Sequence, residues 1–255
     1  MSRLDSEIDV LGYRAKIGIL VPFTNTIVQP EFESMAPQGV TNHTARIPNR
    51  PRPTHSDEAY AEVMKEGAVG TEEVIDRLLP LDPNLIILGH SIDSFRGGIA
   101  GAKSLERRLN DHAKICDVVL PSLALNSSLE KLEINKSLSI LSPYLKPGGD
   151  QAVSFLEDCG FKIIKIKNLA CPTPLSIAAV SESESKSYIQ ELNAENVEAI
   201  VQVGTNLPFQ RVAAEAESSL GKPVLSINTA TYWYALRKLK IFDKLNGFGA
   251  LFENN

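Results

Sequence analysis

The sequence has little of what marks disulfide-bonded and metal-binding proteins. It contains three cysteines, Cys116, Cys159 and Cys171, and no C-x-x-C spacing. An odd and widely spread set of thiols favours neither a disulfide framework nor a structural zinc site. The four histidines are spread as widely and form no metal-ligand pattern. We therefore expect neither a metal nor another cofactor.

Long apolar runs and basic stretches are also missing. No apolar run approaches the roughly 20 residues of a membrane span, and residues 1–13 mix charges with isolated apolar side chains, unlike the core of a signal peptide. The net charge is −5, and no basic stripe is present, which argues against nucleic acid as a partner. We expect a cytoplasmic protein that binds neither membranes nor nucleic acid; association into a homo-oligomer stays open.

What the sequence does contain is the composition of a globular protein, with 43% hydrophobic and 22% charged residues. Its most informative stretch is the apolar run Leu85 to Leu88, which lacks alternation and is typical of a parallel strand buried on both faces. The run stops at Gly89 and a polar cluster. The same pattern recurs in the second half, where Ala199 to Val203 stops at Gly204. Two matching strand ends predict two lobes that share one cleft.

Apolar strand-like segments alternate with helical ones along the rest of the chain. This predicts the α/β class: two pseudo-symmetric lobes, each a four-stranded, mostly parallel sheet flanked by helices, with the active-site cleft between them. The strands are expected at 16–22, 40–47, 85–88, 114–120, 137–142, 161–169, 199–203 and 222–227. Further expectations are a Pro-rich loop at 48–53, a long helix over 56–79 and a C-terminal helix over 229–239 that packs on the first lobe.

The expected division of the chain follows this order of segments. Residues 1–14 form an N-terminal extension. The first lobe comprises 15–115 together with 227–255, and the second lobe comprises 116–226.

Polar residues follow four of the expected strands, and they are the candidates for a binding site. In open α/β sheets, ligands bind at the carboxyl ends of strands, where helix N-termini also offer free N–H groups to anions. No phosphate loop or dinucleotide fingerprint is present. We therefore expect a small anionic ligand, held by residues at these ends: Asn25, Thr26, Gly89, His90, Ser91, Asp93, Tyr144, Gly204, Thr205 and Asn206.

Four segments carry a family resemblance: V-P-F-T-N-T, G-H-S-x-x-S-F-R-G, S-P-Y and V-G-T-N-L. They resemble the aspartate/glutamate/hydantoin racemase superfamily, most closely its maleate cis-trans isomerase and arylmalonate decarboxylase branch. The resemblance runs from about Lys16 to Leu239 and implies a small carboxylic acid as substrate, with one or two catalytic cysteines at the two central strand ends. At those positions the resemblance places Gly89, or else His90, and Gly204. Both usual cysteines are therefore absent.

The resemblance also implies residue roles. Ser91, Tyr144 and the N–H groups of Gly204 and Thr205 match a pocket that would hold a carboxylate and stabilise an enediolate, and Asn25 would hold a second carboxylate or carbonyl. The full set of substrate-binding candidates is Pro22, Asn25, Thr26, Gly89, Ser91, Tyr144, Thr173, Gly204, Thr205 and Asn206.

The catalytic candidates are His90, Ser91, Asp93 and Cys171. His90 is the histidine placed for acid/base work near neutral pH. Asp93 either supports that chemistry or caps the following helix. Cys171 is either a nucleophile on a loop at the cleft or a half-buried spectator thiol.

The function that these residues favour is a cysteine-independent lyase or isomerase that acts next to a carboxylate through an enediolate-type intermediate. Two alternatives stay open. One is a non-catalytic protein that binds small carboxylates on the same fold, and the other is an isomerase or racemase that depends on Cys171.

Overall fold

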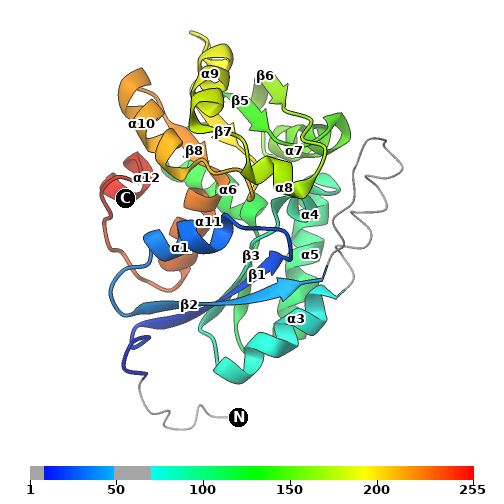
Figure 1. The fold of residues 1–255 in the computed structure, drawn as a ribbon, viewed down its shortest axis with the longest axis vertical. Helices are drawn as coiled ribbons and strands as arrows, with labels where there is room; N and C mark the ends of the chain where they lie inside the picture. The colour runs from blue at the N-terminus through cyan, green and yellow to red at the C-terminus, as the bar shows by residue number, and fades with distance from the viewer. Residues whose placement is uncertain (1–8, 49–69) are drawn as a thin grey trace.

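The computed structural model describes residues 9–48 and 70–255, and within them the chain forms two four-stranded sheets (Figure 1). The strand order of the first sheet is β2 (Val40–Ile47), β1 (Ala15–Pro22), β3 (Leu85–Leu88) and β4 (Asp117–Val119). That of the second is β6 (Lys162–Asn168), β5 (Ser137–Ser142), β7 (Ala199–Gln202) and β8 (Val224–Ser226). All six strand pairs are parallel. The sheets share one topology, which confirms the predicted pseudo-symmetric α/β fold.

Helices fill the space between the sheets and cover their outer faces (Figure 1). The helices whose side chains enter the core that both sheets share include α1 (Val28–Ser34), α4 (Ser91–Phe95), α6 (Pro121–Lys131), α7 (Lys146–Asp158) and α11 (Ile227–Lys238). The outer face of the first sheet packs against α3 (Thr71–Leu78) and α5 (Gly98–Ala113), and that of the second against α9 (Glu182–Leu192) and α10 (Gln210–Leu220). The remaining helical elements are short: η1 (Leu79–Leu81), α8 (Pro174–Ala178) and α12 (Ala250–Asn254).

Strand β3 shows why its sequence is apolar without alternation. Leu85 and Ile87 point into the core between the sheets, whereas Ile86 and Leu88 pack with α3 and α5 on the outer face. All four side chains are buried. Since successive side chains of a strand point to opposite faces, a strand covered on both faces must be apolar throughout. Such a strand ends where the chain leaves the core. The polar residues that follow β3 therefore lie at the edge of the sheet.

One predicted boundary is wrong. Strand β4 pairs with β3, with Ile86 opposite Val118, and therefore belongs to the first sheet. The predicted boundary between residues 115 and 116 places this strand in the second lobe. The sequence of a three-residue strand does not indicate which strand it pairs with. The rest of the division into lobes stays a prediction.

Several other expectations can be compared with the structure. The C-terminal helix packs on the first half as predicted, with the ring centroids of Phe32 and Tyr232 4.9 Å apart. The short helices α4, α8 and α12 were not predicted. Residues 49–53 of the Pro-rich loop and residues 56–69 of the long helix lie outside the described residues.

Within the described ranges, no helix is both long and apolar enough to cross a membrane.

Candidate active site at two strand ends

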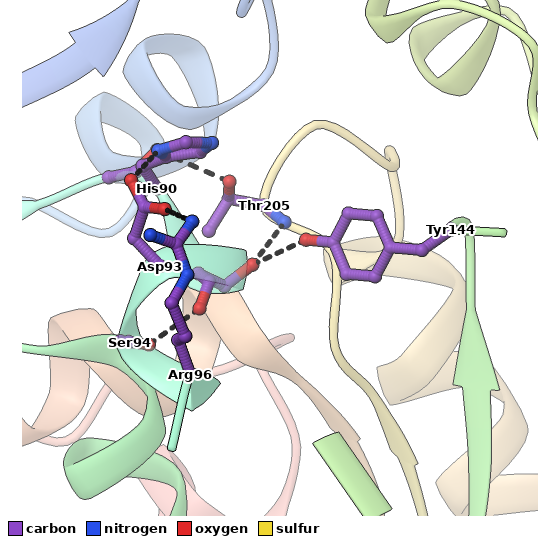
Figure 2. A network of polar contacts seen from close by, with 8 residues as sticks. His90, Asp93, Ser94, Arg96, Tyr144 and Thr205 are labelled. Atoms are coloured by element: carbon purple, nitrogen blue, oxygen red, sulfur yellow. Dashed lines mark hydrogen bonds and ion pairs between the residues drawn. The ribbon is translucent and has the colours of Figure 1, made fainter. Parts of the chain in front are cut away.

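The centre of the candidate site is the fully buried Ser91, the first residue of α4, which follows β3. Its Oγ lies 2.7 Å from the carbonyl oxygen of Val203, 2.8 Å from the Tyr144 hydroxyl and 3.3 Å from the Thr205 backbone nitrogen. Because a carbonyl oxygen only accepts, Ser91 donates to Val203, and Tyr144 and Thr205 then donate to Ser91. Figure 2 shows Tyr144 and Thr205 directed toward the same point. Two hydrogen-bond donors therefore converge where an anionic oxygen could be held.

A tightly packed glycine follows the end of each central strand. A Cβ atom on Gly89 would lie 2.8 Å from the carbonyl oxygen of Leu20 and 2.8 Å from a methyl carbon of Val21. A Cβ atom on Gly204 would overlap the ring of Pro143. Neither position accepts a side chain without a backbone shift, so each end requires the one residue that lacks Cβ.

A histidine–carboxylate pair lies beside the Ser91 cluster (Figure 2). His90 Nδ1 lies 2.9 Å from one carboxylate oxygen of Asp93, and Arg96 lies 2.8 Å from the other. Burial opposes ionisation of Asp93, but the positive charges of His90, Arg96 and Arg108 together with the His90 hydrogen bond hold its pKa below the usual value. An ionised carboxylate only accepts, so His90 carries its proton on Nδ1 toward Asp93. Nε2 is then the ring nitrogen of His90 that does not face Asp93.

These contacts bear on the capping role expected for Asp93. The N-cap of α4 is His90 and that of α5 is Gly97, and Asp93 caps neither helix with its side chain. Its carboxylate instead orients His90.

Tyr144 follows β5 in the second half and reaches the site from the opposite side. Burial raises the pKa of its hydroxyl, and the hydrogen bond with Ser91 only partly opposes this effect. The phenol stays protonated at neutral pH, so Tyr144 acts as a donor and not as a charged acceptor.

Asn25 and Asn206 lie nearby, but their side chains bind protein backbone. Asn25 Oδ1 accepts from the N–H groups of Ile27 and Val28, at 3.0 and 2.9 Å, at the start of α1. Asn206 Oδ1 accepts from the N–H of Thr26 at 2.9 Å, and its Nδ2 donates to the carbonyl of Pro174 at 2.7 Å. These bonds join the loop after β1 to the loops of the second half. That either residue also contacts substrate stays a prediction, as it does for Pro22 and Thr26.

Cys171 and Thr173 lie on the loop after β6. The Cys171 N–H donates to the carbonyl of Pro143 at 3.0 Å, which sets this loop beside the one that carries Tyr144. Burial raises the pKa of the Cys171 thiol, which disfavours the nucleophilic thiolate. Thr173 Oγ1 accepts from the N–H of Ser176 at 3.1 Å and caps α8. In the part of the chain that the structure describes, neither side chain hydrogen-bonds to Tyr144.

The structure adds two groups that no sequence pattern selects, the partly buried Glu31 and the buried Asn228. Glu31 on α1 accepts from the N–H groups of Phe209 and Gln210, both at 3.1 Å, and from Asn228 Nδ2 at 2.6 Å. Asn228 also donates to the carbonyl of Thr205 at 3.0 Å. Burial raises the pKa of Glu31, against these hydrogen bonds. An acidic residue on a short helix has no sequence signal that separates this role from a solvent-exposed one.

The described residues contain no group of three or more His, Cys, Asp or Glu side chains that could hold a metal ion.

Solved structures with the same two-sheet architecture define the class of fold. The maleate cis-trans isomerase of Nocardia farcinica bound to TRIS superposes with a TM-score of 0.85 at 22% identity, over 94% of this chain and 98% of that one. A crystal structure of arylmalonate decarboxylase gives a TM-score of 0.71 at 18% identity, over 94% of this chain and 100% of that one. The chain has the fold of these enzymes.

Comparison of sequences identifies the family. The family model for arylmalonate decarboxylase matches residues 17–252, so the chain belongs to the arylmalonate decarboxylase family. The chain is also 24% identical to the maleate isomerase of Pseudomonas putida, over 92% of this chain and 96% of that protein. It is 22% identical to the maleate isomerase of Geobacillus stearothermophilus over the same shares. The resemblance inferred from the sequence is confirmed.

Proposed function

We propose that this protein is an enzyme that acts next to the carboxylate of a small carboxylic acid, through an enediolate-type intermediate and without a catalytic cysteine. The observation that carries the proposal is the convergence of the Tyr144 hydroxyl and the Thr205 N–H on Ser91 Oγ, beside the His90–Asp93 pair. Donors for an anion and a group that exchanges protons thus lie together.

The donors perform the electrostatic part of the reaction. A substrate carboxylate accepts from Tyr144 and Thr205, and the Ser91 hydroxyl joins them by turning away from the carbonyl of Val203. When a bond at the α-carbon breaks, its electron pair spreads into this carboxylate and forms an enediolate. Preorganised donors gain strength as that charge grows, and each is worth about 3 to 4 kcal/mol in the transition state.

His90 performs the proton transfer. In a lyase reaction the bond from the α-carbon to a second carboxyl group breaks, carbon dioxide leaves, and protonated His90 gives its Nε2 proton to the α-carbon. In an isomerase reaction neutral His90 removes a proton from the α-carbon and returns one. A positioned general acid or base contributes about 10²- to 10⁴-fold. Asp93 holds the ring in the orientation that both routes need.

Cysteine independence is supported by both strand ends. The Nocardia farcinica enzyme has been captured with a covalently bound succinylcysteine intermediate, which requires a thiol. Gly89 and Gly204 supply no nucleophile, and the contacts at both positions leave no room for a side chain. Neither strand end therefore offers a thiolate that could add to a double bond.

A second candidate is an isomerase or racemase that depends on Cys171. One observation favours it: the backbone bond from Cys171 to Pro143 sets the thiol's loop beside Tyr144. The raised pKa of the thiol weighs against it, because few thiolates would form near neutral pH.

Binding and turnover test the proposal in sequence. We expect thermal-shift screening against C3 to C6 carboxylic acids, including maleate and substituted malonates, to find at least one acid that stabilises the protein. Product analysis should then show turnover of a stabilising acid. No stabilisation by any acid contradicts the substrate class, whereas stabilisation without turnover across the panel identifies a non-catalytic binding protein.

A further inference from the structure

The peptide group between Gly204 and Thr205 is held from behind by Gln202. This residue lies on β7 and is fully buried. Its Nε2 donates to the carbonyl oxygen of Gly204 at 2.6 Å. The same peptide group carries the Thr205 N–H, which donates toward the anion-holding position at Ser91. Gln202, together with the backbone N–H of Leu207 at 3.0 Å, thus binds the oxygen of the peptide whose N–H faces the site.

The orientation of the Gln202 carboxamide follows from its surroundings. A flipped amide would set Oε1 against the carbonyl of Gly204, and two acceptors would face each other. In the observed orientation Oε1 is buried without a hydrogen-bond partner among the described residues. Leaving a buried acceptor unpaired costs free energy. Gln202 therefore keeps its Nε2 bond to Gly204 although its Oε1 has no hydrogen-bond partner among the described residues.

The next peptide group is held in the same way. The Thr205 carbonyl accepts from Asn228 Nδ2 at 3.0 Å, and Asn228 is held in turn by Glu31 at 2.6 Å. Two consecutive carbonyls of the loop after β7 are therefore bound by buried carboxamides. A donor at a peptide oxygen also polarises the group and strengthens its N–H as a donor, since linked hydrogen bonds reinforce each other.

We propose that Gln202 is a positioning residue: through the carbonyl of Gly204 it sets the direction and donor strength of the Thr205 N–H toward a substrate carboxylate. This inference deepens the proposed function and rests on it for the nature of the ligand. Gln202 itself lies behind the peptide and acts only through it.

The test begins in the ligand-free protein, so that it does not depend on the substrate. In Gln202→Met the chain length is kept and the donor is lost. We expect the backbone ¹⁵N resonance of Thr205 to move and the hydrogen exchange of its N–H to speed up roughly 3- to 10-fold, the size that one neutral hydrogen bond supports. Gln151→Met, on α7, is the matched control, because it removes a carboxamide outside this loop and should leave Thr205 unchanged.

Gln202→Glu adds a test within one protein. The introduced carboxyl group opposes the carbonyl of Gly204 when it is ionised, whereas in its protonated form it can donate to that carbonyl. After correction for intrinsic exchange, the protection of Thr205 should therefore return as the pH falls, while Gln202→Met shows no such return. If Gln202→Met does not fold, the pH dependence of Thr205 protection in Gln202→Glu tests the same inference.

Binding of maleate, or of the acid that stabilises the wild type best, is the second measurement. We expect the affinity to fall roughly 3- to 10-fold in Gln202→Met and to stay unchanged in Gln151→Met. An unchanged Thr205 resonance and exchange rate in folded Gln202→Met would overturn the inference, as would equal losses in both variants. If no acid binds the wild type, the proposed function fails, and the amide measurements still decide whether Gln202 holds this peptide.

Discussion

The carboxyl ends of β3 and β7 occupy equivalent places in the two sheets, yet they carry different chemistry. Each central strand is followed by a glycine that packs too closely for a side chain, Gly89 in one case and Gly204 in the other. After the first come His90 and Asp93, which can hold and move a proton. After the second comes Thr205, which offers a neutral N–H donor. One end is suited to proton transfer and the other to holding an anion.

Two partly buried carboxyl groups extend this comparison. Asp93 pairs with His90 and Arg96, and its pKa lies below the usual value despite burial. Glu31 stands behind the β7 end and accepts hydrogen bonds from neutral donors, and burial raises its pKa. The same chemical group is thus driven in opposite directions, because cations surround one carboxyl group and amides surround the other.

The largest expected effect comes from removing the proton-transfer group of the β3 end. His90→Gln should lower turnover of the preferred carboxylic acid by about 10²- to 10⁴-fold, since no other general acid stands at that position. Binding of the acid should change little, because the donors remain. Steady-state kinetics and a binding titration measure the two effects separately. His112→Gln, which alters a histidine paired with Asp76 on the outside of α5, is the control, and full activity of His90→Gln would refute the assignment.

The next effect concerns the anion-holding side. Tyr144→Phe removes one of the two donors that converge on Ser91 and should lower kcat by about 10²- to 10³-fold, as loss of one such donor does in comparable sites. Tyr188→Phe, on α9, is the control for loss of a hydroxyl. Equal activity of the two variants would show that Tyr144 serves packing alone.

A third prediction tests whether the glycine ends can be converted to cysteine ends. Gly89→Cys and Gly204→Cys should each destabilise the fold by about 1 to 3 kcal/mol, because the new Cβ meets the Leu20 carbonyl or the Pro143 ring. Urea denaturation measures the loss. A cysteine variant that keeps wild-type stability would show that these contacts relax easily. The inference that neither position has room for a side chain would then be wrong.

The smallest effects are those of pH on stability. The lowered pKa of Asp93 means that its contribution is fully present above the unfolded pKa of about 3.9 and is lost as the pH falls through the folded pKa. The raised pKa of Glu31 has the opposite sign, so stability declines as the pH rises from about 4.3 through its folded pKa.

Each carboxyl group can change the free energy of unfolding by at most about 1.4 kcal/mol per pH unit within its window. Asp93→Asn should flatten the acid limb of the stability profile, and Glu31→Gln should flatten the decline on the other side. Urea denaturation across pH 2 to 8 checks both. Parallel profiles for wild type and variant in either window would contradict the opposite directions inferred for the two groups.

The sequence predicts the strand ends well, for a physical reason. A strand covered on both faces must be apolar, so the run from Leu85 to Leu88 and its stop at Gly89 are visible without a structure. The meeting of Ser91 with Tyr144 also follows from the prediction of two lobes that share one cleft at the carboxyl ends of their strands.

What the sequence does not show is how the site is supported. The bond between Glu31 and Asn228 joins residues 197 positions apart, and no local pattern reports such a contact. The sequence also does not show that Asn25 Oδ1 accepts from backbone N–H groups at the start of α1, a contact that short polar side chains before a helix often make. Helix α4 is a single turn, too short for an apolar periodicity to appear.

The most direct test of the central claim, chemistry at a carboxylate without a thiol, is turnover by Cys171→Ser, compared with wild type before and after alkylation of all thiols. We predict unchanged turnover in Cys171→Ser and, provided that circular dichroism shows an intact fold, little loss on alkylation. Loss of activity in folded Cys171→Ser, with His90→Gln still active, would contradict the account and assign the nucleophile to Cys171.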